Sequence, residues 1–273
     1  MSPELELQGR RLVEHIAGLE RVAVAFSGGV DSTLVLAAAV RALGPEKAVG
    51  VIGVSPSLPA RELEAALKVG RDVGARVETM QTHELDREGY RLNGPDRCYH
   101  CKTELFTLLS RYSETHDRPV ILDGTNADDR HDVRPGRQAA RELGVRSPLL
   151  EVGLGKEGIR ELSRAWGICT WSKPASPCLS SRIPHFAEVT VDKLGAIEQA
   201  EARLAALGLE EFRVRHHGDI ARLELHPKDW ARILDAGVRT SLIAELRSLG
   251  FRYVSLDLEG FRSGSLTEKS TRS

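Results

Sequence analysis

The sequence lacks the features of a membrane-embedded or secreted protein. Its start, Met1-Ser-Pro-Glu-Leu-Glu6, has no cationic segment followed by an apolar core, and no apolar run approaches the roughly 18 residues that span a bilayer. Only four cysteines occur among 273 residues, too few for a disulfide scaffold in a chain of this length. We therefore expect a cytoplasmic protein whose cysteines are thiols, metal ligands or redox groups.

A surplus of basic residues is also missing. The chain carries 38 Lys and Arg against 39 Asp and Glu, whereas proteins that bind nucleic acid usually have a basic surplus or a basic stripe. This balance argues, though only weakly, against tRNA or another nucleic acid as partner. The length allows one large domain or two of ordinary size, and no internal repeat is present.

The most informative segment is a short apolar run followed by a glycine-bearing turn and an apolar helix. Val22 to Phe26 is typical of a buried parallel strand, and Thr33 to Val40 continues as an alanine-rich helix. The turn between them is Ser27-Gly-Gly-Val-Asp-Ser32. Glycines let backbone N–H groups approach phosphate oxygens, and a helix N-terminus adds partial positive charge. The turn is therefore predicted to bind a pyrophosphate group.

Two common nucleotide loops are absent from this turn. A Walker A loop requires Gly-Lys-Ser/Thr, and a dinucleotide fingerprint requires three spaced glycines with an acid about twenty residues later. The sequence Ser-Gly-Gly-Val-Asp-Ser after a strand instead resembles the PP-loop of the ATP pyrophosphatases, the adenine nucleotide alpha hydrolase superfamily, which split ATP into AMP and pyrophosphate. The alternative is a glycine turn in an ordinary α/β unit.

Strands and helices alternate in the first part of the chain. Further strands are expected at 48–54, 76–82 and 120–123, with helices at 60–73, 102–114 and 156–166. This rhythm predicts an α/β fold with a doubly wound parallel sheet and a ligand at the carboxyl ends of its strands. A Pro- and Ser-rich connector follows, then a helix at 191–207, two antiparallel strands at 212–216 and 220–225, and two more helices. We expect a PP-loop domain at 1–172, a connector at 173–187 and a small α+β domain at 188–273.

A second candidate nucleotide segment is Asp123-Gly-Thr-Asn-Ala-Asp-Asp129, which follows the apolar strand at 120–123. Because a hard dication takes carboxylate and phosphate oxygens, Asp128 or Asp129 could orient Mg²⁺ on the phosphates of ATP. Arg134 follows in the sequence and could contact phosphate. The alternative is a turn whose acids cap a helix.

Cysteine spacing suggests a metal or redox site. Cys98 and Cys101 have C-x-x-C spacing in a loop expected to enter a helix, and Cys178 stands in the connector. Three thiolates can hold a 4Fe-4S cluster with one iron open, whereas zinc with His100 as a further ligand or a redox dithiol would use the same spacing. Cys169 lies in an apolar segment between two tryptophans, where we expect it to pack.

Together these motifs resemble the LarE family of ATP-dependent sulfur transferases, which make the nickel-pincer nucleotide cofactor. The resemblance covers nearly the whole chain. It rests on the PP-loop and on six further segments: Pro95-Asp-Arg-Cys-Tyr-His-Cys-Lys102, Leu122-Asp-Gly-Thr-Asn-Ala-Asp128, Arg134-Pro-Gly136, Cys178-Leu-Ser-Ser-Arg-Ile-Pro184, Arg213-Val-Arg-His-His-Gly-Asp-Ile-Ala-Arg222 and Gly260-Phe-Arg-Ser-Gly264.

The resemblance implies adenylation of the carboxylates of a pyridinium-3,5-biscarboxylic acid mononucleotide, release of pyrophosphate, and sulfur transfer. It also implies a homo-oligomer, and lactate racemase maturation proteins as possible partners. Arg213 and Arg215, two apart on a strand, would clamp the substrate phosphate unless they are solvent-facing. The implied catalytic residues are Asp31, Ser32 and Cys178. The implied ATP- and substrate-binding residues are Ser27, Gly28, Gly29, Asp31, Ser32, Gly124, Thr125, Asn126, Asp128, Arg134, Arg182, Arg213 and Arg215. The implied metal ligands are Cys98, Cys101 and Cys178 for the cluster, and Asp129 and Glu201.

The sulfur source has two candidates in this family. In the sacrificial form one connector cysteine gives up its sulfur and becomes dehydroalanine, whereas in other relatives three cysteines hold a 4Fe-4S cluster that delivers sulfide. Here Pro177 occupies the position of the sacrificial cysteine and Cys178 follows it, a departure that favours the cluster. A tRNA-thiolating enzyme, an amidating synthetase of the NAD or GMP type, and a non-catalytic nucleotide sensor are the other classes compatible with a PP-loop.

Overall fold

The computed structural model describes residues 2–131 and 135–262 and divides them into two compact units. The first unit comprises Met1–Tyr90 and Pro95–Ser176, and the second comprises Arg91–Gly94 and Pro177–Ser273. The change from one unit to the other at Ser176 and Pro177 lies inside the 173–187 connector. Within the described ranges, no helix combines the length and the apolar character needed to cross a bilayer.

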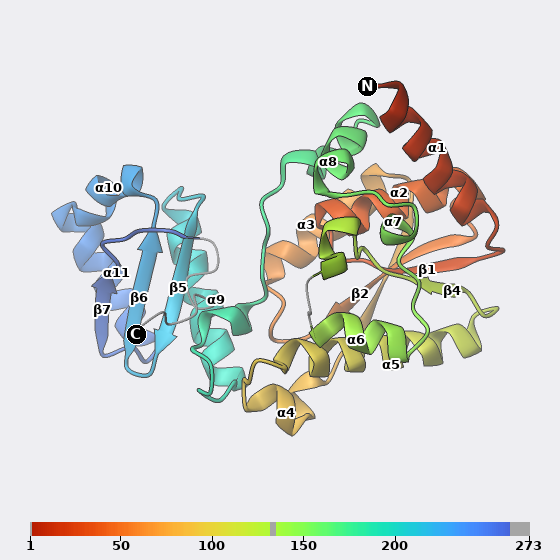
Figure 1. Ribbon diagram of the computed structural model, residues 1–273. Helices are drawn as coiled ribbons and strands as arrows, with labels where there is room; N and C mark the ends of the chain where they lie inside the picture. Colours follow the sequence, from red (N-terminus) through yellow and green to blue (C-terminus); the bar gives the residue numbers. More distant parts are fainter. Residues whose placement is uncertain (1, 132–134, 263–273) are drawn as a thin grey trace. The chain divides into compact units, whose positions relative to one another are not determined.

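A four-stranded parallel sheet forms the centre of the first unit (Figure 1). Its strands are β1 (Val22–Ala25), β2 (Ala48–Val54), β3 (Arg76–Gln81) and β4 (Val120–Leu122), in the order β3-β2-β1-β4. Val22 pairs with Ala48 on one side and Val120 on the other. The order reverses direction at β1, so the carboxyl end of β1 lies at the topological switch point where such sheets bind ligands. The predicted α/β fold is confirmed.

Helices cover both faces of this sheet (Figure 1). The apolar core on one face includes side chains of α1 (Pro3–Ala17), α2 (Val30–Leu43), α3 (Ala60–Asp72), α7 (Pro148–Glu151) and α8 (Lys156–Ala165). The core on the other face includes side chains of α5 (Arg97–Thr115) and α6 (Pro135–Glu142). Successive residues of β1 serve the two cores in turn: Val22 and Val24 face the α2 side, Ala23 and Ala25 the α5 side. Because both faces are buried, the strand is apolar at every position, as its sequence suggested.

The second unit is a small α+β fold. Its sheet has the order β5-β6-β7, in which β5 (Phe212–His217) and β6 (Ile220–Leu225) are antiparallel and β7 (Tyr253–Leu256) is parallel to β6. The helices α9 (Val191–Ala206), α10 (Trp230–Leu234) and α11 (Ala236–Ser248) bury Leu204, Ile233 and Leu246 against this sheet. The unit therefore has its own apolar core.

The first helix and the placement of residues 91–94 were not anticipated from the sequence. In α1, the Ser2 hydroxyl accepts a hydrogen bond from Leu5 N (3.2 Å) and Pro3 begins the helix. Residues 91–94 leave the first unit, because the Asn93 amide donates to backbone oxygens of Pro184 (2.7 Å) and Ala187 (3.0 Å). Such a long-range contact has no signal in the local sequence.

Short elements complete the chain. They are the α-helix α4 (Glu88–Arg91) and the 3₁₀ helices η1 (Glu84–Asp86), η2 (Ala127–His131), η3 (Cys169–Ser172), η4 (Leu179–Arg182) and η5 (Pro227–Asp229).

Candidate functional site

The turn after β1 is organised by its own serine side chains. Ser32 Oγ accepts a hydrogen bond from Ser27 N (3.2 Å) and lies 3.0 Å from Ser27 Oγ, while Thr33 Oγ1 donates to Gly29 O (2.6 Å). Gly29 is the N-cap residue of α2, and Asp31 lies in the first turn of that helix. The N-terminal N–H groups of α2 thus begin directly at the loop, an arrangement that favours phosphate.

Gly28 is required at its position for two reasons. Its φ of +66° lies in the left-handed region, and a Cβ there would come within 2.6 Å of Ala66 Cβ and 2.8 Å of Ala66 Cα in α3. The loop backbone therefore packs directly on α3. A side chain at residue 28 would displace the backbone that forms the predicted phosphate site.

The segment after β4 meets this loop. A Cβ added at Gly124 would lie 2.9 Å from Ser32 N, so the backbone of residue 124 packs against the start of α2. The Asp123 carboxylate accepts hydrogen bonds from Thr125 N (3.1 Å), Thr125 Oγ1 (2.7 Å) and Ser147 Oγ (2.7 Å), which hold the turn in place. The structure thus brings together two segments that are about 90 residues apart in the sequence.

The two acids that follow in the sequence, Asp128 and Asp129, accept hydrogen bonds from backbone N–H groups. Asp128 Oδ2 accepts from Lys156 N (2.7 Å) at the start of α8, and Asp129 Oδ2 accepts from Asn126 N (3.2 Å). Asp128 thus caps the start of α8 in this structure, and its role in nucleotide binding stays a prediction. The metal-binding role of Asp129 stays a prediction. Arg134, the predicted phosphate contact, lies outside the described residues.

A cavity of about 180 Å³ adjoins the segment after β4. Thr125 and Ser147 line it from one side, and Arg137 and Arg141 of α6 contribute guanidinium groups. Arg137 also donates to the backbone oxygen of Asp129. Glu151 also lines the cavity, and its carboxylate pairs with Arg146 (2.6 Å). The cavity therefore combines hydroxyl groups with charges of both signs.

Polar side chains that were not anticipated from the sequence also lie just after β2 and β3. Glu84 is 3% exposed, and its Oε1 accepts from Ser55 Oγ (2.5 Å) and Ser57 Oγ (2.9 Å). All four strands of the parallel sheet thus end in polar groups. The local sequence could have revealed Ser55, because it directly follows an apolar strand, whereas Glu84 acquires its meaning only through the pairing of β2 with β3.

Cys98 and Cys101 lie within the first two turns of α5, and the expectation of a loop at this point was wrong. The helix begins at Arg97, directly after Pro95 and Asp96, so the three-residue spacing places both thiols on one helical face. His100 between them hydrogen-bonds Asp96 (3.2 Å) and lies so close to Gly89 that a Cβ there would overlap the imidazole. Two thiolate ligands on one face suit a metal or an iron-sulfur cluster.

In the second unit, an arginine fixes the backbone around Cys178. Arg182 is 3% exposed and donates to the backbone oxygens of Pro177 (2.7 Å) and Cys178 (3.2 Å). The same guanidinium pairs with Glu201 in α9, through Nε to Oε1 (2.9 Å) and Nη2 to Oε2 (3.2 Å). Glu201 Oε1 also accepts from Val214 N (3.2 Å). Glu201 is thus engaged in positioning Arg182, and its role as a metal ligand stays a prediction.

Arg213 and Arg215 lie on the same face of β5 and are buried, so the solvent-facing alternative was wrong. Arg215 donates to Ser181 O (2.7 Å), next to the Cys178 turn, and to Glu224 Oε2 (2.9 Å). Burial lowers the pKa of Arg213, and the neighbouring cations Arg215 and Arg182 lower it further.

The buried arginines and glutamates of the second unit carry a net positive charge. Three buried guanidinium groups (Arg182, Arg213 and Arg215) face two buried carboxylates (Glu201 and Glu224), which leaves one net positive charge. A buried net positive charge favours an anion as a ligand.

The side chains that could bind a metal ion are spread over the described residues of both units. In residues 2–131 and 135–262, no set of three or more His, Cys, Asp or Glu side chains is placed to hold a metal ion. Mg²⁺ usually binds through one or two carboxylates together with substrate phosphates and water, and Asp31 in the first turn of α2 supplies one carboxylate next to the phosphate loop. The residues present therefore fit Mg²⁺ carried by ATP. For the cluster, Cys98 and Cys101 belong to the first unit and Cys178 to the second.

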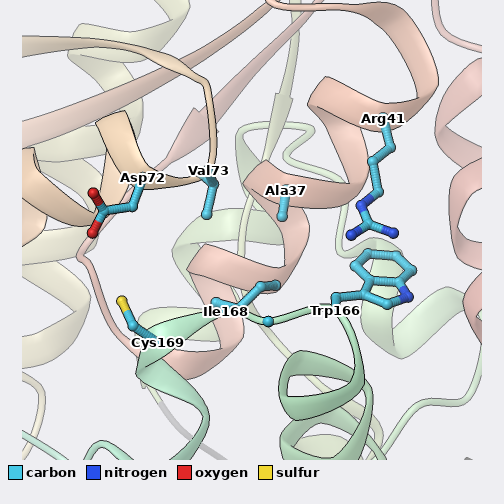
Figure 2. A pocket seen from close by; sticks show the side chains of 8 residues that line it. Ala37, Arg41, Asp72, Val73, Trp166, Ile168 and Cys169 are labelled. Atoms are coloured by element: carbon cyan, nitrogen blue, oxygen red, sulfur yellow. The ribbon is translucent and has the colours of Figure 1, made fainter.

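Cys169 differs from its expectation, because it is exposed and lines a pocket of about 390 Å³ instead of packing in a core (Figure 2). The pocket lies along the second half of α2, where the Arg41 guanidinium sits 3.9 Å from the ring centre of Trp166. Asp72 lines the same pocket. None of the four cysteines forms a disulfide.

The parallel sheet, the serine-glycine loop at its switch point and the loop's position at the start of α2 define an ATP-utilising α/β protein of the PP-loop type. Consistently, the sequence profile of the NAD synthase family matches residues 9–92.

Relatives that match along nearly the whole chain show the family to which the protein belongs. The chain is 38% identical over 262 residues to the pyridinium-3,5-bisthiocarboxylic acid mononucleotide synthase of Lactiplantibacillus plantarum, covering 96% of this chain and 94% of that protein. It is also 41% identical over 268 residues to an uncharacterized protein of Synechocystis sp., covering 98% and 100%. An uncharacterized protein of Methanocaldococcus jannaschii is 27% identical over 244 residues, covering 89% and 92%. The chain belongs to the pyridinium-3,5-bisthiocarboxylic acid mononucleotide synthase family, and the predicted LarE relationship is confirmed.

Proposed function

We propose that the protein is an ATP-dependent sulfur transferase that converts the carboxylates of a pyridinium-3,5-biscarboxylic acid mononucleotide to thiocarboxylates, as a step towards the nickel-pincer cofactor. The observation that carries this proposal is the 38% identity, along nearly the full length of both chains, to a synthase of the bisthiocarboxylic acid mononucleotide. The phosphate loop and the buried arginines support it, because the reaction needs a site for pyrophosphate and a site for an anionic substrate.

Activation comes first, because a carboxylate is a poor acyl donor. The substrate carboxylate oxygen attacks the α-phosphorus of ATP, a new O–P bond forms, and the bond to the pyrophosphate oxygen breaks. Negative charge builds on the leaving pyrophosphate, which the N–H groups at the start of α2 stabilise. Mg²⁺, when bound, supplies further positive charge on the phosphates. Ser27 and Ser32 keep the loop in shape by their mutual hydroxyl contact (3.0 Å).

Sulfur transfer follows on the acyl adenylate. A sulfur nucleophile attacks the acyl carbon, and AMP leaves with the C–O electron pair, which yields the thiocarboxylate. The substrate carries a phosphate in addition to its carboxylates, and Arg213 and Arg215 are the groups we assign to that phosphate. They are already fixed in the second unit by Arg262 O (3.0 Å from Arg213 Nη1) and Glu224, so little ordering is needed on binding.

For the sulfur source, we favour a 4Fe-4S cluster ligated by Cys98, Cys101 and Cys178 over consumption of Cys178 itself. Support comes from the C-x-x-C spacing on one face of α5 and from Pro177 at the position of the sacrificial cysteine. In the second route the Cys178 thiolate attacks the adenylate and a base removes the Cα proton. The Cβ–S bond then breaks to leave dehydroalanine and the thiocarboxylate, without net oxidation.

The reaction is tested by mixing the protein with ATP, Mg²⁺ and the pyridinium dicarboxylate mononucleotide and measuring pyrophosphate. We expect pyrophosphate only when all are present, and a product heavier by the exchange of oxygen for sulfur when sulfide is supplied to the reconstituted protein. Pyrophosphate release that requires tRNA in place of the mononucleotide would favour the tRNA-thiolating class. ATP binding without pyrophosphate release with either substrate would contradict the proposal.

The sulfur source is tested by anaerobic reconstitution with iron and sulfide. A cluster predicts a brown protein with about four irons, lost in Cys178→Ala and retained in Cys169→Ala. Cys169 is the matched control because it is an exposed cysteine outside the proposed ligand set. A colourless wild type that loses the mass of H₂S at Cys178 after turnover would replace the cluster with the sacrificial route.

A further inference from the structure

The phosphate loop has no cation of its own. From Val22 to Val40 the sequence contains no lysine or arginine, although the loop is expected to hold a pyrophosphate group with several negative charges. The N-terminus of α2 supplies only about half an elementary charge. A cation that contacts this loop from elsewhere in the chain would therefore strengthen phosphate binding.

Lys173 is such a cation. Its ammonium donates to the backbone oxygen of Gly28 (3.1 Å) and pairs with Glu62 Oε2 of α3 (3.0 Å). Both charged side chains are largely buried, with 22% and 20% exposed, respectively. Lys173 is 145 residues from Gly28 in the sequence, at the start of the Pro- and Ser-rich connector.

The backbone around Lys173 is held from both sides. Arg160 of α8 donates to Trp171 O (2.7 Å) and Lys173 O (3.2 Å), and Lys173 N donates to Thr170 O (2.9 Å). The lysine is thus presented to the loop by a fixed segment of the first unit.

We propose that Lys173 binds the polyphosphate of ATP in the loop of residues 27–32 and that Glu62 holds its ammonium when no nucleotide is bound. This inference rests on the proposed ATP-dependent function. An ammonium has three donors in flexible directions, so it can keep Gly28 O while exchanging Glu62 for a phosphate oxygen. Lys173 thereby supplies the charge that a Walker lysine supplies within its own loop.

The test compares ATP and AMP binding to wild type, Lys173→Gln and Glu62→Gln by calorimetry. Lys173→Gln should weaken ATP binding by about tenfold or more, because a charge-assisted hydrogen bond contributes more than a neutral one. AMP has no β- and γ-phosphates, so its affinity should change less than about twofold. Glu62→Gln removes the competing carboxylate and should tighten ATP binding by about fivefold or more, because about fivefold is the upper range for an exposed ion pair and this pair is largely buried.

Lys68→Gln is the matched control, because Lys68 is an exposed lysine of the same helix as Glu62 and its loss changes the net charge equally. Its ATP affinity should stay within about twofold of wild type. A purely structural Lys173–Glu62 pair predicts a different pattern: both variants would lower the melting temperature and neither would change the ratio of ATP to AMP affinity. That result would overturn the inference, as would unchanged or weaker ATP binding in Glu62→Gln.

The two proposals fail in distinguishable ways. A wild type that binds ATP and releases pyrophosphate, together with a Lys173→Gln variant of equal ATP affinity, would refute the role of Lys173 and leave the proposed function intact. A wild type that binds no ATP would refute the proposed function. If Lys173→Gln does not fold, the Glu62→Gln variant alone decides, because only phosphate competition predicts tighter binding.

Discussion

Replacing Gly28 by alanine isolates the close packing that shapes the phosphate loop. The new Cβ would sit 2.6 Å from Ala66 Cβ and 2.8 Å from Ala66 Cα, and such overpacking costs about 1–3 kcal/mol. The φ of +66° adds about 1–2 kcal/mol for a residue with a Cβ. We expect Gly28→Ala to lower the free energy of unfolding by about 2–5 kcal/mol. ATP should bind at least about tenfold more weakly, because the loop relieves the overlap by moving away from α3.

The variant Gly74→Ala separates the cost of steric overlap from the cost of the left-handed backbone conformation. Gly74 follows the same helix α3, has a φ of +73° and has nothing within 4 Å of an added Cβ, so its substitution incurs only the backbone strain. Urea unfolding of both variants, together with calorimetric ATP titration, gives the steric part as their difference. In a double-mutant cycle with Ala66→Gly, the double variant Gly28→Ala, Ala66→Gly should show a favourable coupling energy of about 0.5 kcal/mol or more, because the Cβ–Cβ overlap is removed. Equal destabilisation in Gly28→Ala and Gly74→Ala would refute the reasoning.

Three further predictions concern buried polar groups around the connector and the second unit. Glu201→Ala leaves Arg182 buried without its carboxylate and should lower the free energy of unfolding by about 3–5 kcal/mol in urea titration; a loss below about 1 kcal/mol would contradict this. Burial, followed by neighbouring cations, lowers the pKa values of His216 and His217 below 6.5. The unfolded chain then binds more protons, so stability should be complete above pH 6.5 and fall as the pH drops below it, by at most about 1.4 kcal/mol per pH unit for each histidine. A His216→Gln, His217→Gln double variant should flatten this profile, and an unchanged slope would count against the assignment. Asn93→Ala should cost about 1–3 kcal/mol, seen as a lower urea midpoint, whereas an unchanged midpoint would show that its backbone contacts contribute little.

The parts of the fold that depend on local pattern were predictable from the sequence. The range of β2 was predicted as Ala48–Val54, which is what the structure has, because both faces of that strand are buried and every position is apolar or glycine. The helix that carries Cys98 and Cys101, α5, begins at Arg97, whereas the sequence predicted its start at residue 102. Its first turns carry charged and polar residues that do not form an apolar stripe, so helical periodicity was not visible there.

The site residues that escaped prediction are those defined by distant contacts. Lys173 is notable only because its ammonium reaches Gly28, and Glu84 only because two serines from the neighbouring strand surround its carboxylate. Neither residue lies in a recognisable nucleotide motif. A sequence pattern reports spacing along one element, whereas these side chains are brought together by sheet order and by the return of the chain after α8.

The two proposed anion sites differ in how their cations are paired before a ligand binds, and this difference affects the salt dependence of ATP binding. In the second unit Arg182 and Arg215 are buried and already paired with Glu201 and Glu224, so their cost of desolvation is met when that unit folds. In the first unit, the proposed role of Lys173 requires its ammonium to exchange Glu62 for a phosphate oxygen, so part of the interaction energy with ATP would be used in breaking the Lys173–Glu62 pair. Salt should therefore weaken ATP binding less than a bare lysine–phosphate contact would predict, because it screens the competing Lys173–Glu62 pair as well.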